Sequence, residues 1–382
     1  MPMNENPTLG AASRKQKLAI LVNMISPARI PLYSTLAEQF DLLLLHGGNE
    51  SNRDTWSDVY RQLPGARVAK VWGWQIPLTR RIRGRTFDRR YLHVTPGYLW
   101  QLFRFRPDLI VTNEMGLRTL LALTYATMAR KPVWVWWGGT LHTEHHIGAI
   151  KRSVRSLIAR WAKRWISYGK SSTEYLLTLG INRDSVLELQ NSVDERRFLG
   201  TAEVAYKIEP RPVLLHVGQF TGRKGIELLL RAAAAQQNRG QNFSLVLVGS
   251  GPDRGASEQL SRELRLKNVY FLPSQEPDRM PSIYKSADVL IFPTLEDVWG
   301  LVANEAMLSG LPVLCSKYAG CAGELFEPQS IFDPLNPQEF AQKVGQAIEG
   351  QLPRPNVSRL ESTSQLVANL VQALNCSPGK LA

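Results

Sequence analysis

Residues 213–232, VLLHVGQFTGRKGIELLLRA, decide the expected fold of this chain. An apolar run of strand length ends at Gly218, a loop containing the sequence RKG follows, and a pattern of helical period begins directly after it. Glycines allow close approach to the backbone, a helix start offers free N–H groups, and Arg223 and Lys224 add two positive charges. This combination suits a diphosphate. The alternative is a strand-to-helix turn whose basic side chains are simply solvated.

Short apolar runs alternate with amphipathic stretches in both directions from this segment. This alternation predicts parallel sheets with crossover helices, and therefore an α/β fold of two Rossmann-like, doubly wound domains that face a central cleft. Ligands of such domains normally bind in the cleft, at the carboxyl ends of the strands. The strand candidates are residues 18–23, 40–46, 66–72, 108–113, 132–137, 212–218, 243–249, 268–273, 288–294 and 312–316.

This alternation stops at residues 191–212, which lack periodicity and contain two prolines near their end. We interpret this stretch as a linker between an N-terminal domain, residues 1–190, and a C-terminal domain, residues 213–357. The last helical pattern, about 358–382, is expected to pack back on the N-terminal domain.

Length and composition agree with this organisation. A chain of 382 residues is long enough for two domains at roughly 150 residues each. Its 44% hydrophobic and 21% charged residues are ordinary for a globular protein, and no stretch approaches the ~20 consecutive apolar residues of a membrane span. The cysteines Cys315, Cys321 and Cys376 form no CxxC pair, so we expect a reducing, cytoplasmic compartment and no cysteine-based metal site.

The positive charge lies almost entirely in the first half of the chain. Residues 1–200 hold 29 Lys+Arg and 15 Asp+Glu, which gives +14, whereas residues 201–382 hold 17 and 18, which gives −1. This asymmetry indicates that the first half faces an anionic partner: nucleic acid, a lipid surface or a phosphorylated substrate.

Two basic segments contribute to this charge, TRRIRGRTFDRRY (79–91) and IKRSVRSLIARWAKRW (150–165). The second is predicted to be an amphipathic helix that docks on an anionic membrane surface. The alternative is a helix that packs on its own domain; a nucleic-acid partner is not expected, because no recognised motif accompanies the charge. On a helical wheel, Ile150, Val154, Leu157, Ile158, Trp161 and Trp165 share one arc, while Lys151, Arg152, Arg155 and Lys163 lie elsewhere.

An acidic segment lies in PTLEDVWGLVANEAMLSGLPVLCS (293–316). A strand pattern leads into a loop with Glu296 and Asp297, and a helix pattern that contains Glu305 follows. Carboxylates near a helix start are favoured as caps. A partly buried Glu305 would need hydrogen-bond donors, and ribose hydroxyls would serve; the alternative is a cap and a surface glutamate.

Together these two segments resemble glycosyltransferase family 4, the group 1 transferases, which have the GT-B fold. That family carries an acidic residue, seven others and then Glu, matched here by Asp297 and Glu305, and a basic loop matched by RKG at 223–225. The commoner first residue is Glu, so Glu296 or Asp297 takes that position. The resemblance extends to NSVD (191–194), VLVGSGP (246–252) and SADVLIFPT (286–294) and, more loosely, to NMISPARIPLYSTLAE (23–38) and WWGGTLHTEHH (136–146).

The resemblance implies metal-independent transfer of a sugar from a nucleotide-sugar, with retention of anomeric configuration. Lys224 and Arg223 would neutralise the leaving diphosphate, Asp297 would hold the donor sugar, and Glu305 would hold the ribose. His142 is expected to orient the acceptor hydroxyl; a metal site with Glu144 and His146 is an alternative. The other expected donor-binding residues are Gly218, Gln219, Gly249, Gly251, Leu272, Gly300 and Leu301, and the expected acceptor-binding residues are Arg29 and Gly139.

We therefore expect a glycosyltransferase (a hexosyltransferase) that uses a UDP- or GDP-sugar, needs no cofactor or metal, and modifies a lipid, a lipid-linked saccharide or another glycan. It is expected to be cytoplasmic and peripherally associated with the inner face of a membrane. The alternatives are a nucleotide-sugar epimerase of the same fold and a non-catalytic basic protein that binds surfaces.

Overall fold

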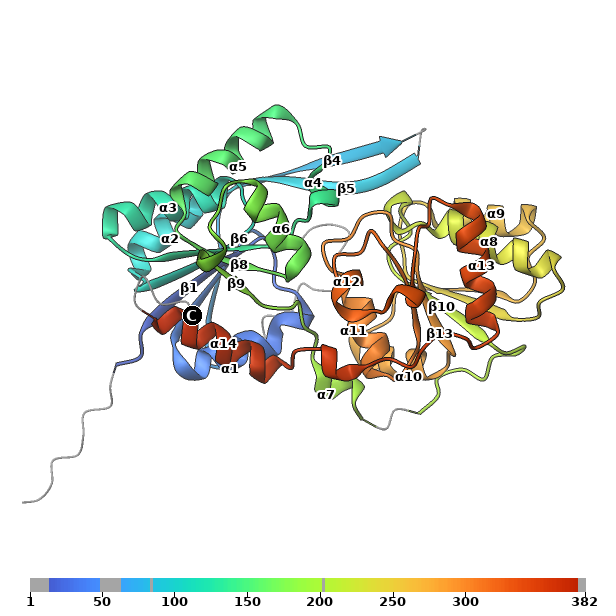
Figure 1. Ribbon diagram of the computed structural model, residues 1–382. Helices are drawn as coiled ribbons and strands as arrows, with labels where there is room; N and C mark the ends of the chain where they lie inside the picture. The colour runs from blue at the N-terminus through green and yellow to red at the C-terminus, as the bar shows by residue number, and fades with distance from the viewer. Residues whose placement is uncertain (1–13, 49–62, 83–84, 201–202, 377–382) are drawn as a thin grey trace, which may run out of the picture.

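The computed structural model describes residues 14–48, 63–82, 85–200 and 203–376. These residues form an α/β protein with two domains, each built around a parallel sheet with helices on both faces (Figure 1). The predicted fold class is therefore confirmed. Among the helices in these ranges, none combines the length and apolar character that a membrane crossing requires.

The N-terminal sheet has seven parallel strands in the order β3-β2-β1-β6-β7-β8-β9. One core lies between this sheet and helices α2, α3, α5 and α6, and a second lies on the opposite face, beneath α1. The strands are β1 (Lys17–Val22), β2 (Asp41–His46), β3 (Arg67–Lys70), β6 (Leu109–Asn113), β7 (Val133–Trp137), β8 (Arg164–Ser167) and β9 (Val186–Glu188); the helices are α1 (Ile30–Gln39), α2 (Gly97–Phe105), α3 (Leu117–Ala129), α4 (Leu141–Glu144), α5 (Ala149–Trp161) and α6 (Lys170–Thr178). The short helix α7 (Glu195–Phe198) follows and packs on the core of the C-terminal domain.

The C-terminal sheet has six parallel strands in the order β12-β11-β10-β13-β14-β15. Its central strands are buried on both faces because helices cover both, as expected of a doubly wound sheet. The strands are β10 (Val213–Val217), β11 (Ser244–Val248), β12 (Val269–Leu272), β13 (Val289–Phe292), β14 (Val313–Ser316) and β15 (Ile331–Phe332); the helices are α8 (Ile226–Asn238), α9 (Arg254–Glu263), α10 (Met280–Lys285), α11 (Leu301–Leu308), α12 (Ala322–Leu325) and α13 (Pro337–Ile348).

The last helix, α14 (Thr363–Asn375), returns to the N-terminal domain and lies beside α1 (Figure 1). Its buried Leu366, Leu370 and Leu374 recur every four residues and complete the core on that face of the sheet. Ser362 caps the helix by accepting a hydrogen bond from the backbone N–H of Gln365.

The basic helix predicted over residues 150–165 is shorter than expected. Helix α5 ends at Trp161, and Trp165 lies in strand β8, where it is only 1% exposed. Ile158 is also fully buried, and the Arg155 side chain turns inward to pair with Glu144. The prediction of one continuous amphipathic helix was therefore wrong at its C-terminal end, because the aromatic and β-branched residues there pair with β7 and β9 instead.

The other basic segment, residues 79–91, contributes to an antiparallel hairpin that the sequence analysis did not predict. Its strands are β4 (Trp74–Ile82) and β5 (Arg85–Val94). Figure 1 shows the hairpin leaving the N-terminal domain and extending toward the C-terminal domain. Strand β5 lies against the short 3₁₀ helix η5 (Gly222–Lys224), which contains Arg223 and Lys224 of the RKG loop.

Candidate active site

The RKG loop and the acidic loop meet at the cleft side of the C-terminal sheet. The RKG loop follows β10 and the acidic loop follows β13, and these two strands are neighbours in the sheet. The backbone N–H of Leu295 donates to Arg223 O at 2.8 Å, so the two loops are held together by main-chain contact. Adjacent parallel strands thus bring two motifs together that lie about seventy positions apart in the sequence.

The side chains of these loops form a largely buried charge cluster. Lys224 Nζ lies 2.5 Å from Asp297 Oδ2, and Arg223 Nη1 lies 3.9 Å from the same oxygen. Arg223 also donates to the backbone carbonyl of Glu296 at 2.8 Å. The Glu296 carboxylate pairs with Arg80 of the hairpin at 3.4 Å. The cluster is therefore cationic on the RKG side and connects the two domains through Arg80.

The ionisation of Asp297 follows from these neighbours. Burial alone would raise the pKa of this carboxyl, but the positive charges of Lys224 and Arg223 outweigh burial and hold the pKa below its ordinary value. The backbone N–H of Trp299 also donates to Asp297 Oδ1 at 3.3 Å. Asp297 is thus a carboxylate at neutral pH, fixed at the start of the segment that leads into α11.

Glu305 lies eight positions farther along the chain, on α11, and has a different environment. Tyr284 of α10 donates a hydrogen bond to Glu305 Oε2 at 2.7 Å. Burial raises the pKa of Glu305 to about 7, although the Tyr284 hydrogen bond acts in the opposite direction. Glu305 therefore exchanges a proton near neutrality, unlike Asp297. Tyr284 is a partner that sequence reasoning missed, since no local pattern connects it to Glu305.

Glycine residues keep the space above the strand ends free of side chains. At Gly249, φ is +148°, and an added Cβ would come within 1.9 Å of Gly218 O. The loops after β10 and β11 can approach each other this closely only because Gly249 lacks a side chain. Among the other predicted donor-binding residues, Gln219 and Gly251 lie in these loops, Leu272 ends β12, Gly300 caps α11 and Leu301 begins it.

His142 reaches across the cleft from the N-terminal domain. Helix α4 is held by a capping box in which Thr140 and Thr143 exchange hydrogen bonds. His142 Nε2 lies 2.8 Å from Leu295 O, and its ring stacks on Tyr318 with centroids 4.3 Å apart. The structure therefore brings the predicted His142 directly against the acidic loop, although 153 positions separate His142 from Leu295.

The two residues predicted to bind the acceptor lie in different surroundings. Gly139 lines a pocket on the N-terminal side of the cleft. Arg29 is buried, lies 4.5 Å over the ring of Trp136, and donates to Asn191 Oδ1 at 2.7 Å. Asn191 in turn accepts at its carbonyl oxygen from Asn304 of α11. Arg29 thus connects the first loop of the N-terminal domain to the start of the linker and to the C-terminal domain.

The pocket that contains Gly139 has a volume of about 570 Å³ and an apolar wall. Near its polar end, Asn23 donates to Glu114 Oε2 at 2.9 Å, and the buried Arg118 bonds to Asn23 Oδ1. The apolar lining comes from both domains and from the hairpin: Leu92, Met115, Leu117, Leu120, Trp137, Ile150, Val154 and Val298.

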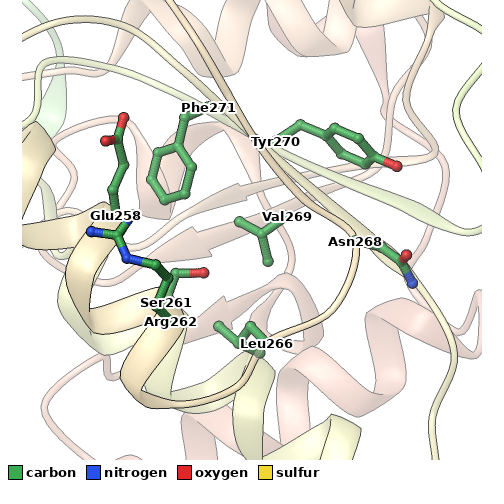
Figure 2. Close-up of a pocket in the computed structure, with 8 residues that line it drawn as sticks. All are labelled: Glu258, Ser261, Arg262, Leu266, Asn268, Val269, Tyr270 and Phe271. Carbon is green, nitrogen blue, oxygen red and sulfur yellow. The ribbon is translucent and has the colours of Figure 1, made fainter.

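A separate hollow of about 480 Å³ lies at the outer edge of the C-terminal sheet, between α9 and β12 (Figure 2). Leu266, Val269 and Phe271 contribute apolar atoms to it, and Glu258 and Arg262 contribute charge. None of the predicted site residues lines this hollow, so we assign it no role in the reaction. In the described ranges, no group of three or more His, Cys, Asp or Glu side chains is arranged to hold a metal ion.

Comparison with known proteins indicates which class of enzyme has a fold and a sequence similar to those of this chain. A family model described as "Glycosyl transferases group 1" matches residues 202–363, which include the RKG loop, Asp297 and Glu305. Chains of two solved proteins superpose over 94% of this chain and 95% of their own length: HepE of Anabaena in complex with UDP and glucose (TM-score 0.66, 18% identity) and sucrose-phosphate synthase of Thermosynechococcus elongatus (TM-score 0.69, 20% identity). The fold is therefore the two-domain GT-B fold of glycosyltransferases.

Curated relatives agree with this class. The D-inositol 3-phosphate glycosyltransferase of Nocardia farcinica is 28% identical over 210 residues, or 47% of this chain and 46% of that protein. The sulfoquinovosyl transferase SQD2 of Arabidopsis thaliana is 24% identical over 357 residues, or 87% of this chain and 66% of that protein. An uncharacterized glycosyltransferase of Methanocaldococcus jannaschii is 36% identical over 138 residues, so the match covers 34% of that relative's length and 36% of this chain. Together these findings support a group 1 glycosyltransferase.

Proposed function

We propose that this protein is a retaining, metal-independent glycosyltransferase of family 4 that transfers a hexose from a nucleotide-sugar to a lipid, a lipid-linked saccharide or another glycan. The observation that carries the proposal is the buried cluster in which Lys224 Nζ lies 2.5 Å from Asp297 Oδ2, next to the glycine-lined strand ends. The leaving diphosphate needs positive charge, which Lys224 and Arg223 supply. The reacting sugar needs a hydrogen-bond acceptor, which Asp297 supplies, and the partial exclusion of water strengthens both interactions.

The cations of the RKG loop would act on the leaving group. Without donor, Asp297 neutralises only part of the positive charge of Lys224 and Arg223. A bound diphosphate would compete for the same cations, and its negative charge grows as the bond to the sugar breaks. Lys224 and Arg223 would therefore stabilise the transition state more than the bound donor, which is the requirement for acceleration.

The carboxylates would orient the donor. Asp297, once it shares Lys224 with the diphosphate, can accept hydrogen bonds from sugar hydroxyls. Glu305 would accept hydrogen bonds from the ribose, with Tyr284 holding its carboxyl group in place. His142 would hold the acceptor hydroxyl near the reacting carbon, because its ring lies against the acidic loop.

The pocket around Gly139 supports the acceptor part of the proposal. Its apolar wall suits an acceptor with a hydrocarbon portion, and its polar end suits sugar or phosphate oxygens. We therefore propose a lipid or lipid-linked saccharide acceptor and a cytoplasmic protein that is peripherally associated with the inner face of a membrane. The exposed Lys151 and Arg152 of α5 would contribute to attraction by anionic lipids.

A ligand screen followed by a transfer assay tests this function. UDP, GDP, ADP and their sugars are compared by thermal shift, because a ligand that binds only the folded state raises its stability. We expect UDP or GDP to give the largest shift, as the UDP bound by HepE suggests. The preferred nucleotide-sugar is then incubated with lipid extract, with and without EDTA, and the product anomer is determined by NMR.

The possible outcomes separate the candidate functions. A product of unchanged anomeric configuration, formed equally with EDTA, supports the proposal. An epimer formed from the nucleotide-sugar alone would identify a nucleotide-sugar epimerase instead. If no nucleotide or nucleotide-sugar shifts the melting temperature, the protein is a non-catalytic surface-binding protein and the proposal is wrong.

A further inference from the structure

The β4–β5 hairpin has two chemically different faces. The register places Ile76 opposite Leu92, and opposed residues of an antiparallel pair share one face of the sheet. Trp74 and Leu78 lie two positions from Ile76 in either direction, so they point to the same side. We call these four residues, Trp74, Ile76, Leu78 and Leu92, the hairpin apolar face. Tyr91 and His93 alternate with Leu92 and line the pocket that contains Gly139.

The hairpin apolar face is open to solvent. Trp74 is 62% exposed, and Ile76, Leu78 and Leu92 are 46–49% exposed. The preceding Trp72 is 57% exposed and makes an edge-on contact with Trp74, with ring centroids 6.4 Å apart. Singly exposed apolar residues are normal on proteins, but a contiguous apolar strand face that ends in two tryptophans indicates a contact surface. Tryptophan in particular is favoured at the boundary between lipid and water.

The charge next to this face indicates what kind of surface it contacts. Residues 79–90, TRRIRGRTFDRR, contain six arginines and one aspartate. Two copies of this chain packed through the hairpin apolar face would bring two segments of this strongly basic composition side by side, which is unfavourable. An anionic bilayer, by contrast, attracts arginine at its headgroups and accepts apolar side chains just below them.

The hairpin apolar face also continues into the proposed acceptor pocket. Leu92 belongs to this face and at the same time lines the pocket that contains Gly139. Ile150 of α5, which is 83% exposed, lines the same pocket. A hydrocarbon chain could therefore pass from the hairpin apolar face to the pocket along apolar side chains.

We propose that the hairpin apolar face inserts into the headgroup region of an anionic lipid bilayer, so that the lipid part of the acceptor enters the pocket past Leu92. The lipid acceptor in this proposal rests on the proposed function. The membrane contact itself is inferred from the exposure of the hairpin apolar face and from the positive charge of residues 79–90. The proposal assigns the apolar part of the contact to the hairpin rather than to α5, most of whose predicted apolar arc is at least partly buried.

Two matched variants test this assignment. Ile76→Ser/Leu78→Ser removes one Ile and one Leu from the hairpin, and Ile150→Ser/Leu157→Ser removes the same pair from exposed positions on α5. Each is incubated with vesicles of phosphatidylglycerol or of phosphatidylcholine alone, at low and at raised salt, and the bound fraction is measured by sedimentation. The far-UV circular dichroism spectrum and the melting temperature of each variant without ligand first establish that it is folded.

We expect the wild-type protein to sediment with phosphatidylglycerol vesicles and far less with phosphatidylcholine, and to retain partial binding at raised salt. The hairpin variant should bind about tenfold more weakly and lose the salt-resistant part, while the α5 variant should change less than about threefold. Unchanged binding by the hairpin variant, or a larger loss in the α5 variant, would overturn the proposal. So would a lipid-free wild-type dimer that the hairpin variant converts to a monomer.

The outcome is separable from that of the proposed function. Vesicle binding with no response to any nucleotide would leave the membrane contact standing and reject the transferase. Nucleotide binding, together with vesicle binding that is the same in the hairpin variant as in the wild type, would support the transferase and reject the membrane contact.

Discussion

At the scale of single residues, the site is a set of charges whose ionisation is decided by their immediate neighbours. Asp297 and Glu305 lie eight positions apart on one segment, yet the pKa of Asp297 is lowered and that of Glu305 is raised. The difference arises because Lys224 and Arg223 approach Asp297, whereas Glu305 is buried with the neutral Tyr284 hydroxyl as its partner.

Lys224→Ala should lower turnover by about 100-fold or more, because the lost charge acts mainly on the leaving diphosphate. Arg231→Ala on α8 is the matched control, since Arg231 is exposed and pairs only with the nearby Glu227 in the contacts observed. It removes the same charge close by in the sequence and should leave turnover unchanged. Steady-state kinetics of both variants decide this prediction; wild-type turnover in a folded Lys224→Ala protein would exclude the lysine from the mechanism.

Asp297→Asn should reduce kcat more than Glu296→Gln does, because Asp297 contacts Lys224 whereas the Glu296 carboxylate pairs with Arg80. We expect about 10- to 100-fold for Asp297→Asn if its carboxylate contacts the reacting sugar. Both variants are compared at saturating donor, after their melting temperatures have been checked. A silent Asp297→Asn beside a damaged Glu296→Gln would show that Glu296 is the first acidic residue of the motif.

Glu305→Gln should weaken nucleotide binding and change the pH dependence of stability. Since burial raises the folded pKa of Glu305 to about 7 from an ordinary 4.5, its stabilising contribution is complete below the ordinary value and is lost as pH rises through 7. Glutamine cannot ionise, so the variant should gain stability relative to wild type between pH 5 and pH 8, on the order of 1–3 kcal/mol. Urea unfolding at both pH values measures this; equal pH slopes in the two proteins would contradict it.

At the scale of elements, the donor site is built where strands end and loops begin. Parallel neighbours β10, β11 and β13 place their carboxyl ends on one edge, and the loops that follow them carry the charged and glycine residues. In this arrangement the backbones of neighbouring loops lie unusually close together. A few positions, such as Gly249, therefore have no room for a side chain and require glycine.

Gly249→Ala should destabilise the protein and abolish nucleotide binding. The new Cβ would lie 1.9 Å from Gly218 O, in a backbone conformation with φ of +148° that alanine rarely adopts. Gly255→Ala is the matched control, because Gly255 lies on α9 with nothing within 4 Å of an added Cβ, and it should be neutral or stabilising by about 0.5–1 kcal/mol. Thermal unfolding with and without UDP or GDP compares the two; normal nucleotide binding in Gly249→Ala would mean that the loops can separate without cost.

At the scale of the whole molecule, the cleft is held by contacts between the domains as well as by the chain that links them. Besides His142 and Arg80, Lys170 at the start of α6 donates its backbone N–H to Glu324 Oε1 at 2.7 Å. Ser171 donates to Gly320 O at 3.0 Å beside it. The Glu324 carboxyl group of the C-terminal domain thus lies at the N-terminus of an N-terminal-domain helix, where it accepts a hydrogen bond from a backbone N–H of the first turn.

Closure of the cleft should depend on pH through Glu324. Burial raises its pKa to about 7, against the hydrogen bond from Lys170 N–H, and the negative charges of Glu188 and Glu361 add to the rise. The closed arrangement therefore binds this proton more tightly than an open one, so it should be favoured at low pH and should weaken as pH rises through 7. Small-angle X-ray scattering should record a larger radius of gyration at pH 8 than at pH 6.

The same measurement on Glu324→Gln provides the control. Glutamine keeps a carbonyl oxygen for the Lys170 hydrogen bond but does not ionise, so its radius of gyration should be equal at the two pH values. A pH-dependent opening that persists in Glu324→Gln would assign the effect to another group.

Much of this protein could be predicted from its sequence because the relevant signals are local. Most strands of the two parallel sheets are short apolar runs followed by a loop, and the RKG segment, Asp297 and Glu305 lie within single strand–loop–helix units. The fold class, and the neighbourhood of the RKG and acidic loops, follow from that repetition, since parallel strands place successive loops on one edge.

Only the tertiary structure decided the remainder, because it depends on which distant residues come into contact. Tyr284 beside Glu305 and His142 against Leu295 have no sequence pattern, since the partners lie on different elements. Arg155 is basic and lies on an amphipathic helix, yet packing against Glu144 turns it inward. The basic segment at 79–91 became half of a hairpin with an exposed apolar face, because strand pairing rather than composition determines which side of a chain meets solvent.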